Sequence, residues 1–312
     1  MLISYMKSFK DIAPRVLSVL LGLLFVVSAV LKIVSIDRFE IYIYSYHFFS
    51  LNFSFLVARA AIILELVLGI GLILNFLHKW VWWGNVLMLL GYTFLLVYAQ
   101  ILGRTDNCHC FGDFLQMNPW QSIIKNVVLL ALLALVYKTK ESNCNYQWIS
   151  MFGVAVASSV AVFCISPPDN FTPNYQPTAN LQHELFYESL EQAPLDSLQL
   201  VEGKQVVGIF STGCEYCQMS AHKLALMQAH YGFPKERIHF LFMGSEEGLT
   251  KFYEKAEIEP YPSLLYPDAV KLLRMTNGIF PVIVMMENGK VVHEYEFRNM
   301  KEDEIAAFFK AE

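Results

Sequence analysis

The feature that most constrains the fold is an uninterrupted apolar run, "WVWWGNVLMLLGYTFLLVYAQIL" at residues 80–102, which contains no charged side chain. An α-helix needs roughly 20 apolar residues to cross the hydrocarbon core of a bilayer. The run is therefore predicted to span a membrane. Four other apolar stretches are predicted to do the same, and they occupy residues 16–34, 54–77, 121–137 and 148–166.

The first stretch has an alternative interpretation as a cleaved signal peptide. Lys7, Lys10 and Arg15 precede it, as basic residues precede the apolar core of such peptides. The stretch is longer than most signal-peptide cores, and other predicted spans follow it. A spanning helix is therefore favoured.

The charges divide the chain into two unlike parts. Residues 1–166 carry 11 Lys and Arg against 7 Asp and Glu, whereas residues 167–312 carry 12 against 21. An acidic, charge-rich second part is typical of a soluble domain, and its sign argues against nucleic acid as a partner.

The basic residues of the short loops predict an orientation. They concentrate in the N-terminal tail and in the turns after the second and fourth spans, which favours the cytoplasm for these segments. The chain is expected in the cell (inner) membrane with a cytoplasmic N-terminus. The loop 103–120 and everything after residue 166 are then periplasmic or otherwise extracytoplasmic, where disulfides persist.

That outer loop contains "GRTDNCHCFGDF", in which one histidine separates Cys108 from Cys110. A disulfide between extended residues i and i+2 lies at the upper edge of the permitted Cα separation, so a 108–110 bond would be strained and easily reduced. A structural disulfide or two inert thiols remain an alternative. A zinc site is disfavoured, because adjacent side chains of an extended strand point to opposite faces.

In their order and spacing, the motifs "SAVLK", "LELVLGIGLIL" and "CHCFGD" resemble the DoxX-like membrane proteins, specifically the MauE (methylamine-utilisation) branch, over about residues 10–137. The resemblance implies a four-helix membrane bundle, which is assigned to residues 1–140. The apolar stretch that follows adds a fifth transmembrane helix, assigned to residues 141–166. The resemblance also implies cysteines near the outer face that work beside a thioredoxin-like partner in maturing disulfide-containing enzymes.

The architecture is also similar to the bacterial vitamin K epoxide reductase homologues, which join a quinone-binding helical bundle to a thioredoxin domain. Those relatives separate their two cysteines by two residues, whereas here the spacing is one. No tightly bound cofactor is expected, and a quinone is the candidate electron acceptor. No metal is expected.

Glu65 lies in the middle of the second span, where a bare carboxylate would be costly. It is interpreted either as a proton carrier to a cysteine or quinone, or as a protonated or paired group that fixes helix packing, and the second is favoured. Lys32 and Arg59 are expected to snorkel to the headgroups. Cys144 and Cys164 have no neighbouring cysteine and are expected to be structural.

Residues 167–180 are Pro-rich and are predicted to form a semi-rigid linker. A soluble domain is predicted to follow at residues 181–312. Asn288-Gly289 between two apolar runs indicates a hairpin. The predicted helices are 182–190, 214–230, 246–257, 267–274 and 301–310, and the predicted strands are 204–211, 237–244, 280–287 and 290–297.

A strand, a C-x-x-C motif opening a helix, a second strand and helix, and then a hairpin and final helix resemble the thioredoxin pattern. The resemblance assigns the active site to Cys214-Glu215-Tyr216-Cys217 and a cis-proline to Pro281. Cys214, at a helix N-terminus, is expected to be the nucleophile, because the unpaired N–H groups and the helix dipole lower its pKa. Cys217 would resolve the mixed disulfide, while Glu215 would oppose the lowering.

Pro281 is expected to present backbone groups to a client chain. Tyr216, Phe280 and Tyr261 are candidates to line the client groove or to belong to the core. A half zinc site or a haem attachment is disfavoured, since no second C-x-x-C pair exists and Gln218 replaces the required histidine.

These features predict a membrane-anchored thiol:disulfide oxidoreductase in which Cys214/Cys217 exchange electrons with Cys108/Cys110. Its partners would be exported proteins with thiols or disulfides, the lipid bilayer and a membrane redox partner. Client oxidation is slightly favoured, because Cys144 alone is expected on the cytoplasmic side.

Two alternatives remain open. One is a non-catalytic maturation or scaffold protein. The other is a transporter-like bundle with an accessory redox domain, whose path would use Glu65, Asn85 and Asn126.

Overall fold

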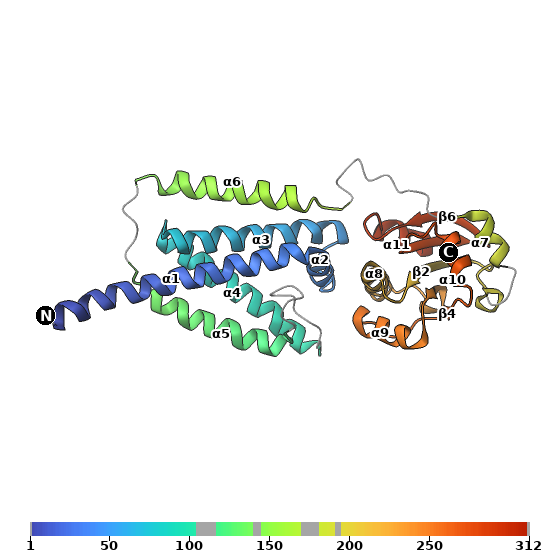
Figure 1. The fold of residues 1–312 in the computed structure, drawn as a ribbon, viewed down its shortest axis with the longest axis horizontal. Coiled ribbons are helices and arrows are strands. Elements are labelled where there is room, and N and C mark those ends of the chain that lie inside the picture. Colours follow the sequence, from blue (N-terminus) through green and yellow to red (C-terminus); the bar gives the residue numbers. More distant parts are fainter. Residues whose placement is uncertain (1, 104–116, 140–144, 170–180, 191–194, 311–312) are drawn as a thin grey trace. The chain divides into compact units, whose positions relative to one another are not determined.

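The structure of the protein is a computed structural model (Figure 1). The structure describes residues 2–103, 117–139, 145–169, 181–190 and 195–310. Contacts group the chain into two compact units, one of Met1–Ile43 and Phe53–Pro168 and one of Tyr44–Asn52 and Asp169–Glu312.

The described N-terminal part of the chain is built from helices. They are α1 (Leu2–Val34), α2 (Ile36–Tyr44), α3 (Leu51–Leu74), α4 (His78–Ile101), α5 (Pro119–Val136) and α6 (Gln147–Ile165). All except α2 contain a segment long and apolar enough to cross a membrane, which confirms the five predicted spans. The short helix α2 was not predicted.

The first four spans form the packed part of the bundle. Leu21, Leu72 and Leu133 come from three different helices and are almost completely buried in one cluster. Because α1 contributes to this core, the structure favours a spanning helix for the first stretch. α6 is the least buried of the five and adds Met151 to the same cluster. These observations agree with a four-helix bundle and a peripheral fifth span.

Backbone groups at two helix ends are paired with side chains of other helices, as a membrane interior requires. The hydroxyl of Ser18 donates to the carbonyl oxygen of Leu72 at 3.0 Å, at the end of α3. The Nε2 atom of His78 lies 3.1 Å from the carbonyl oxygen of Val136, at the end of α5. Such contacts fix where neighbouring helices end.

The second unit contains a five-stranded mixed sheet in the order β4-β3-β2-β5-β6. β2 is parallel to β3 and antiparallel to β5, while β4 is parallel to β3 and β6 antiparallel to β5. The strands are β2 (Lys204–Ser211), β3 (Ile238–Met243), β4 (Ser263–Leu265), β5 (Val282–Glu287) and β6 (Lys290–Tyr295). The three-residue strand β4 was not predicted.

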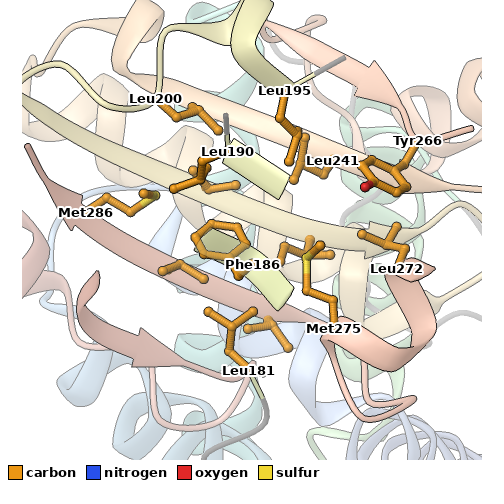
Figure 2. Packing of buried hydrophobic residues seen from close by; sticks show 14 residues of the cluster. Leu181, Phe186, Leu190, Leu195, Leu200, Leu241, Tyr266, Leu272, Met275 and Met286 are labelled. Atoms are coloured by element: carbon orange, nitrogen blue, oxygen red, sulfur yellow. The ribbon is translucent and has the colours of Figure 1, made fainter. Parts of the chain in front are cut away.

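Helices cover both faces of this sheet. They are α7 (His183–Leu190), α8 (Glu215–Tyr231), α9 (Glu246–Ala256), α10 (Ala269–Met275) and α11 (Glu302–Lys310), with 3-10 turns at Leu195–Leu198 and Lys235–Arg237. Figure 2 shows Phe186 of α7 and Leu272 of α10 in a cluster with Leu241 of β3. The predicted fold class, a helical membrane bundle followed by an α/β domain of thioredoxin-like type, is confirmed.

Alternation along β2 divides its side chains between the two faces. Val207 and Ile209 enter the cluster of Figure 2. Phe210 belongs to the other face, where its ring lies 5.1 Å from Phe240 and 5.8 Å from Phe252 of α9. The sheet is therefore buried on both faces, which agrees with the almost continuous apolar sequence of β2.

We expect Gly22→Ala to destabilise the bundle. A β-carbon on Gly22 would lie 2.5 Å from the carbonyl oxygen of Gly69, because α1 and α3 approach closely at these glycines. Overpacking of this kind costs about 1–3 kcal/mol and should lower the thermal unfolding midpoint of the detergent-solubilised protein. Gly91→Ala is the matched control, since a β-carbon there meets nothing within 4 Å. Equal midpoints for the two variants would contradict the close crossing.

Candidate active site

The backbone at the end of β2 places Cys214 at the start of α8. Beyond the strand, the N–H of Thr212 donates to the carbonyl oxygen of Met243 at 3.0 Å, so the pairing with β3 continues. The N–H of Cys214 then donates to the carbonyl oxygen of Ser211 at 3.1 Å, which closes a turn. Helix α8 begins at the next residue.

Two glycines accommodate the side chain of Thr212. A β-carbon on Gly244 would lie 2.0 Å from the Thr212 hydroxyl oxygen, and one on Gly248 would lie 2.7 Å from it. Gly244 also has a φ of +154°, a backbone conformation that favours glycine. Thr212 therefore fits against the turn before α9 and fixes the loop that leads to Cys214. Sequence reasoning missed this contact, because the two sides are about 30 residues apart.

Cys214 is the N-cap residue of α8 and has an extended backbone, with φ −85° and ψ +119°. Its sulfur accepts the backbone N–H of Cys217 at 3.2 Å. A negative charge at this position is stabilised by the free N–H groups of the first helical turn.

Hydrogen bonding makes Cys214 the more acidic thiol of the pair. The side chain of Cys217 and the backbone N–H groups of Cys217 and Tyr216 lower the pKa of Cys214 to about 7, against the opposing effects of burial and of the Glu215 carboxylate. Cys217 is fully buried, and its burial raises the pKa of its thiol. Cys214 is the partly exposed member of the pair, and both thiols are free. Their environments therefore match an attacking and a resolving cysteine.

The peptide bond between Phe280 and Pro281 is cis, as the sequence predicts. β5 begins at the next residue, and Val282 pairs with Ile209 near the end of β2. Because the two strands are antiparallel, Pro281 lies at the same edge of the sheet as the loop that carries Cys214. Its role toward a client chain stays a prediction.

The predicted groove residues differ in their surroundings. Tyr216 is 43% exposed, and its ring lies 5.0 Å from that of Phe297. Phe280 is partly buried and packs against the cluster that contains Val282 and Val284 of β5. Tyr261 is buried with its ring 5.0 Å from Phe240, so it belongs to the core.

Glu65 forms an ion pair inside the bundle. Its Oε2 atom lies 2.6 Å from Nζ of Lys32, and both side chains are almost fully buried. The Lys32 ammonium also donates to the hydroxyl of Ser28 at 2.9 Å and lies 5.8 Å from the ring centre of Tyr92. The expectation that Lys32 snorkels to the headgroups is wrong, because α3 supplies a carboxylate at its level.

Arg59 is the second buried cation of the bundle and does not snorkel either. It pairs with the carboxylate of Glu40 in α2. Its Nε and Nη2 atoms donate to the carbonyl oxygens of Ser166 and Pro167, at 2.8 and 3.1 Å. Arg59 thereby connects α2 and α3 to the end of the fifth span.

The remaining polar candidates have ordinary local contacts or lie outside the structural description. Asn85 and Asn126 are buried and donate to the Val81 carbonyl oxygen and the Thr93 hydroxyl, at 2.8 and 3.1 Å. Cys164 is an exposed free thiol on α6. The predicted cysteines outside the described residues are Cys108, Cys110 and Cys144.

Two comparisons with known proteins bear on the membrane part and on the chain as a whole. Residues 10–139 match the family model described as methylamine utilisation protein MauE, which confirms the predicted resemblance of this segment. The chain is also 26% identical over 301 residues to "Protein TlpB" of Flavobacterium psychrophilum, a match that covers 80% of this chain and 81% of that protein. A match of that extent continues beyond the MauE-like segment into the second unit.

We expect the alkylation rate of Cys214 by iodoacetamide to reach half its plateau near pH 7. The thiolate is the reacting form, so a lowered pKa moves the rate profile to lower pH. Glu215→Gln should move the midpoint lower still, because the glutamate opposes ionisation. Cys217→Ala should move it higher, because a hydrogen-bond donor is lost. A midpoint above pH 8.5 in the unmodified protein would contradict the activated thiol.

We expect Glu65→Gln to destabilise the bundle, because it leaves the Lys32 ammonium buried without its charged partner. Breaking a buried pair in this way costs about 3–5 kcal/mol, whereas replacing both partners with apolar groups is often neutral. The thermal unfolding midpoint should therefore fall for Glu65→Gln and recover in Lys32→Met/Glu65→Met. If the double variant keeps thiol exchange, Glu65 has a packing role. If the double variant loses thiol exchange while its thermal unfolding midpoint is normal, Glu65 transfers protons.

Proposed function

We propose that the protein is a membrane-anchored thiol:disulfide oxidoreductase that acts on exported proteins. The observation that carries the proposal is the contrast between the two thiols of α8. Cys214 is partly exposed with a pKa of about 7, and Cys217 behind it is fully buried. A thiol with a lowered pKa is the better leaving group when a client is oxidised, and its thiolate is the form that attacks a disulfide when the pair is reoxidised.

The proposed reaction moves two electrons and two protons. A client thiolate attacks the Cys214–Cys217 disulfide at Cys214 and displaces the Cys217 thiolate, which takes up a proton. A second client thiol then loses its proton and attacks the mixed disulfide, which releases Cys214. The client gains a disulfide and the C-x-x-C pair becomes a dithiol, which must be reoxidised.

We propose Cys108 and Cys110 as the oxidant of that dithiol. The MauE resemblance and the loop charges support an extracytoplasmic position for both pairs, in a multi-pass chain whose N-terminus is cytoplasmic. The 108–110 disulfide would be reduced to two thiols while Cys214–Cys217 is reformed. A membrane quinone or a redox partner protein would then accept the two electrons and two protons.

The MauE match also supports a second candidate, a non-catalytic maturation protein that holds a client while the bundle recruits a membrane complex. The two candidates differ at Cys214. If Cys214→Ala leaves the disulfides of exported proteins unaltered in cells, the maturation function is favoured. If it changes them, the oxidoreductase is favoured.

We expect the relay to be trapped in the full-length Cys217→Ser variant. Without the resolving thiol, Cys214 should remain joined to Cys108 or Cys110, and peptide mapping by mass spectrometry should detect the bond. The experiment uses a Cys164→Ser background, because Cys164 is an exposed free thiol. Cys217→Ser with Cys214→Ala is the control in which the bond disappears.

Failure to trap either bond, in a protein that still reacts with client disulfides, would overturn the relay while leaving the oxidoreductase function standing. Labelling that places 103–120 and Cys214 on opposite sides of the membrane would overturn it as well.

A further inference from the structure

Tyr216 and Arg298 form a cationic aromatic surface beside the nucleophile, over the buried ring of Phe297. Tyr216, between the two cysteines, is exposed and packs against Phe297. The guanidinium carbon of Arg298 lies 5.7 Å from the ring centre of each aromatic side chain. Its Nη2 atom is 3.5 Å from the Tyr216 hydroxyl. Arg298 therefore holds a permanent positive charge next to Tyr216, the residue two positions after Cys214.

The turn that carries Arg298 is anchored to the same helix as the cysteines. The ammonium of Lys223, a buried residue of α8, donates to the carbonyl oxygen of Phe297 at 3.1 Å and lies 3.7 Å from the centre of its ring. Within the turn, the N–H of Glu296 donates to Oδ1 of Asn299 at 2.6 Å. The guanidinium therefore stands on a fixed backbone, which reduces the entropy lost when it binds an anion.

The guanidinium of Arg298 already forms an ion pair with a carboxylate of the same unit. Nη1 of Arg298 lies 2.9 Å from Oδ1 of Asp169, whose side chain is almost fully buried, while the Arg298 side chain keeps about a third of its surface exposed, at 37%. Arginine presents several donors in one plane and suits carboxylates. The pair shows that Nη1 of Arg298 can bind a carboxylate while Nη2 lies near the Tyr216 hydroxyl.

We propose that Arg298 and Tyr216 form a carboxylate-selective subsite beside Cys214, which takes an acidic side chain of a client next to its reacting cysteine, and that Asp169 competes for it. The inference rests on the proposed oxidoreductase function. The acidic residue is placed two positions from the client cysteine, to match the two positions between Cys214 and Tyr216. The Glu215 carboxylate repels the same client, so the preference depends on the arginine.

The test uses two cysteine peptides that differ only in Glu or Gln two positions after the cysteine. Each is supplied as a mixed disulfide with 2-thiopyridine, a leaving group without a carboxylate. The Cys214 thiolate attacks the peptide sulfur and displaces 2-thiopyridine, whose release is followed by its absorbance in the near ultraviolet. Cys217 then loses its proton and attacks Cys214, which releases the peptide as a thiol. The C-x-x-C pair is oxidised by two electrons, and the mixed disulfide is reduced to two thiols.

With reduced full-length protein at low salt, we expect the Glu peptide to react about two- to fivefold faster than the Gln peptide, as one partly exposed ion pair allows. Arg298→Gln should lower the Glu-to-Gln rate ratio to about one, because the group that binds the client carboxylate is lost. Asp169→Asn should accelerate the Glu peptide alone, because it removes the competing carboxylate. A purely structural role for the Arg298–Asp169 pair would not produce that selective gain.

Lys251→Gln is the matched control, since Lys251 is an exposed lysine on α9 that pairs with Glu247 and its replacement removes one positive charge elsewhere. It should keep the preference for the Glu peptide. An unchanged Glu-to-Gln rate ratio in Arg298→Gln would overturn the subsite, and so would an equal slowing of both peptides in Asp169→Asn. Absence of Cys214-dependent release from either peptide would instead overturn the oxidoreductase function.

Discussion

The backbone N–H of Cys217 points at the sulfur of Cys214, 3.2 Å away, and the chemistry of the second unit depends on this contact. It exists because β2 ends at Ser211 and the chain turns once before α8 begins. Thr212 fixes the turn against two glycines, and the sheet fixes β2 by pairing it on both sides. A sulfur held at a helix N-terminus is stabilised as the thiolate by backbone dipoles. The fold thus activates the thiol with hydrogen bonds of its own backbone.

In the membrane unit, charged side chains are stabilised in a different way, by ion pairs inside the bundle. Lys32 with Glu65 and Arg59 with Glu40 connect three helices through groups that would be costly alone in hydrocarbon. A paired carboxylate is held by its partner, which supports the interpretation of Glu65 as a packing group over that of a proton carrier or transport residue. Arg59 also donates hydrogen bonds to carbonyl oxygens at the end of α6, so a buried charged side chain connects the fifth span to the bundle as well.

Local patterns in the sequence were sufficient to predict the five spans, the hairpin at Asn288-Gly289 and a cysteine pair opening a helix. Hydropathy and turn chemistry act over a few residues, so they are visible without a structure. The partners of Lys32 and Arg298 were not predictable in this way, because they lie 33 and 129 positions away along the chain. Strand β4 was missed because three residues are too few to show an alternation of apolar and polar side chains. Only their pairing with β3 identifies these residues as a strand.

Activation and selection at the candidate site use different groups. The donors that lower the pKa of Cys214 belong to Cys217 and to the first turn of α8, whereas the guanidinium of Arg298 is directed at Tyr216 and at a carboxylate. An arginine engaged by a neighbouring carboxylate contributes little net charge to the sulfur, because the two fields nearly cancel at a distance. The intrinsic reactivity of the thiol can therefore stay constant while the occupant of the arginine changes. This separation would let one nucleophile keep a fixed pKa and still distinguish clients by the charge beside their cysteines.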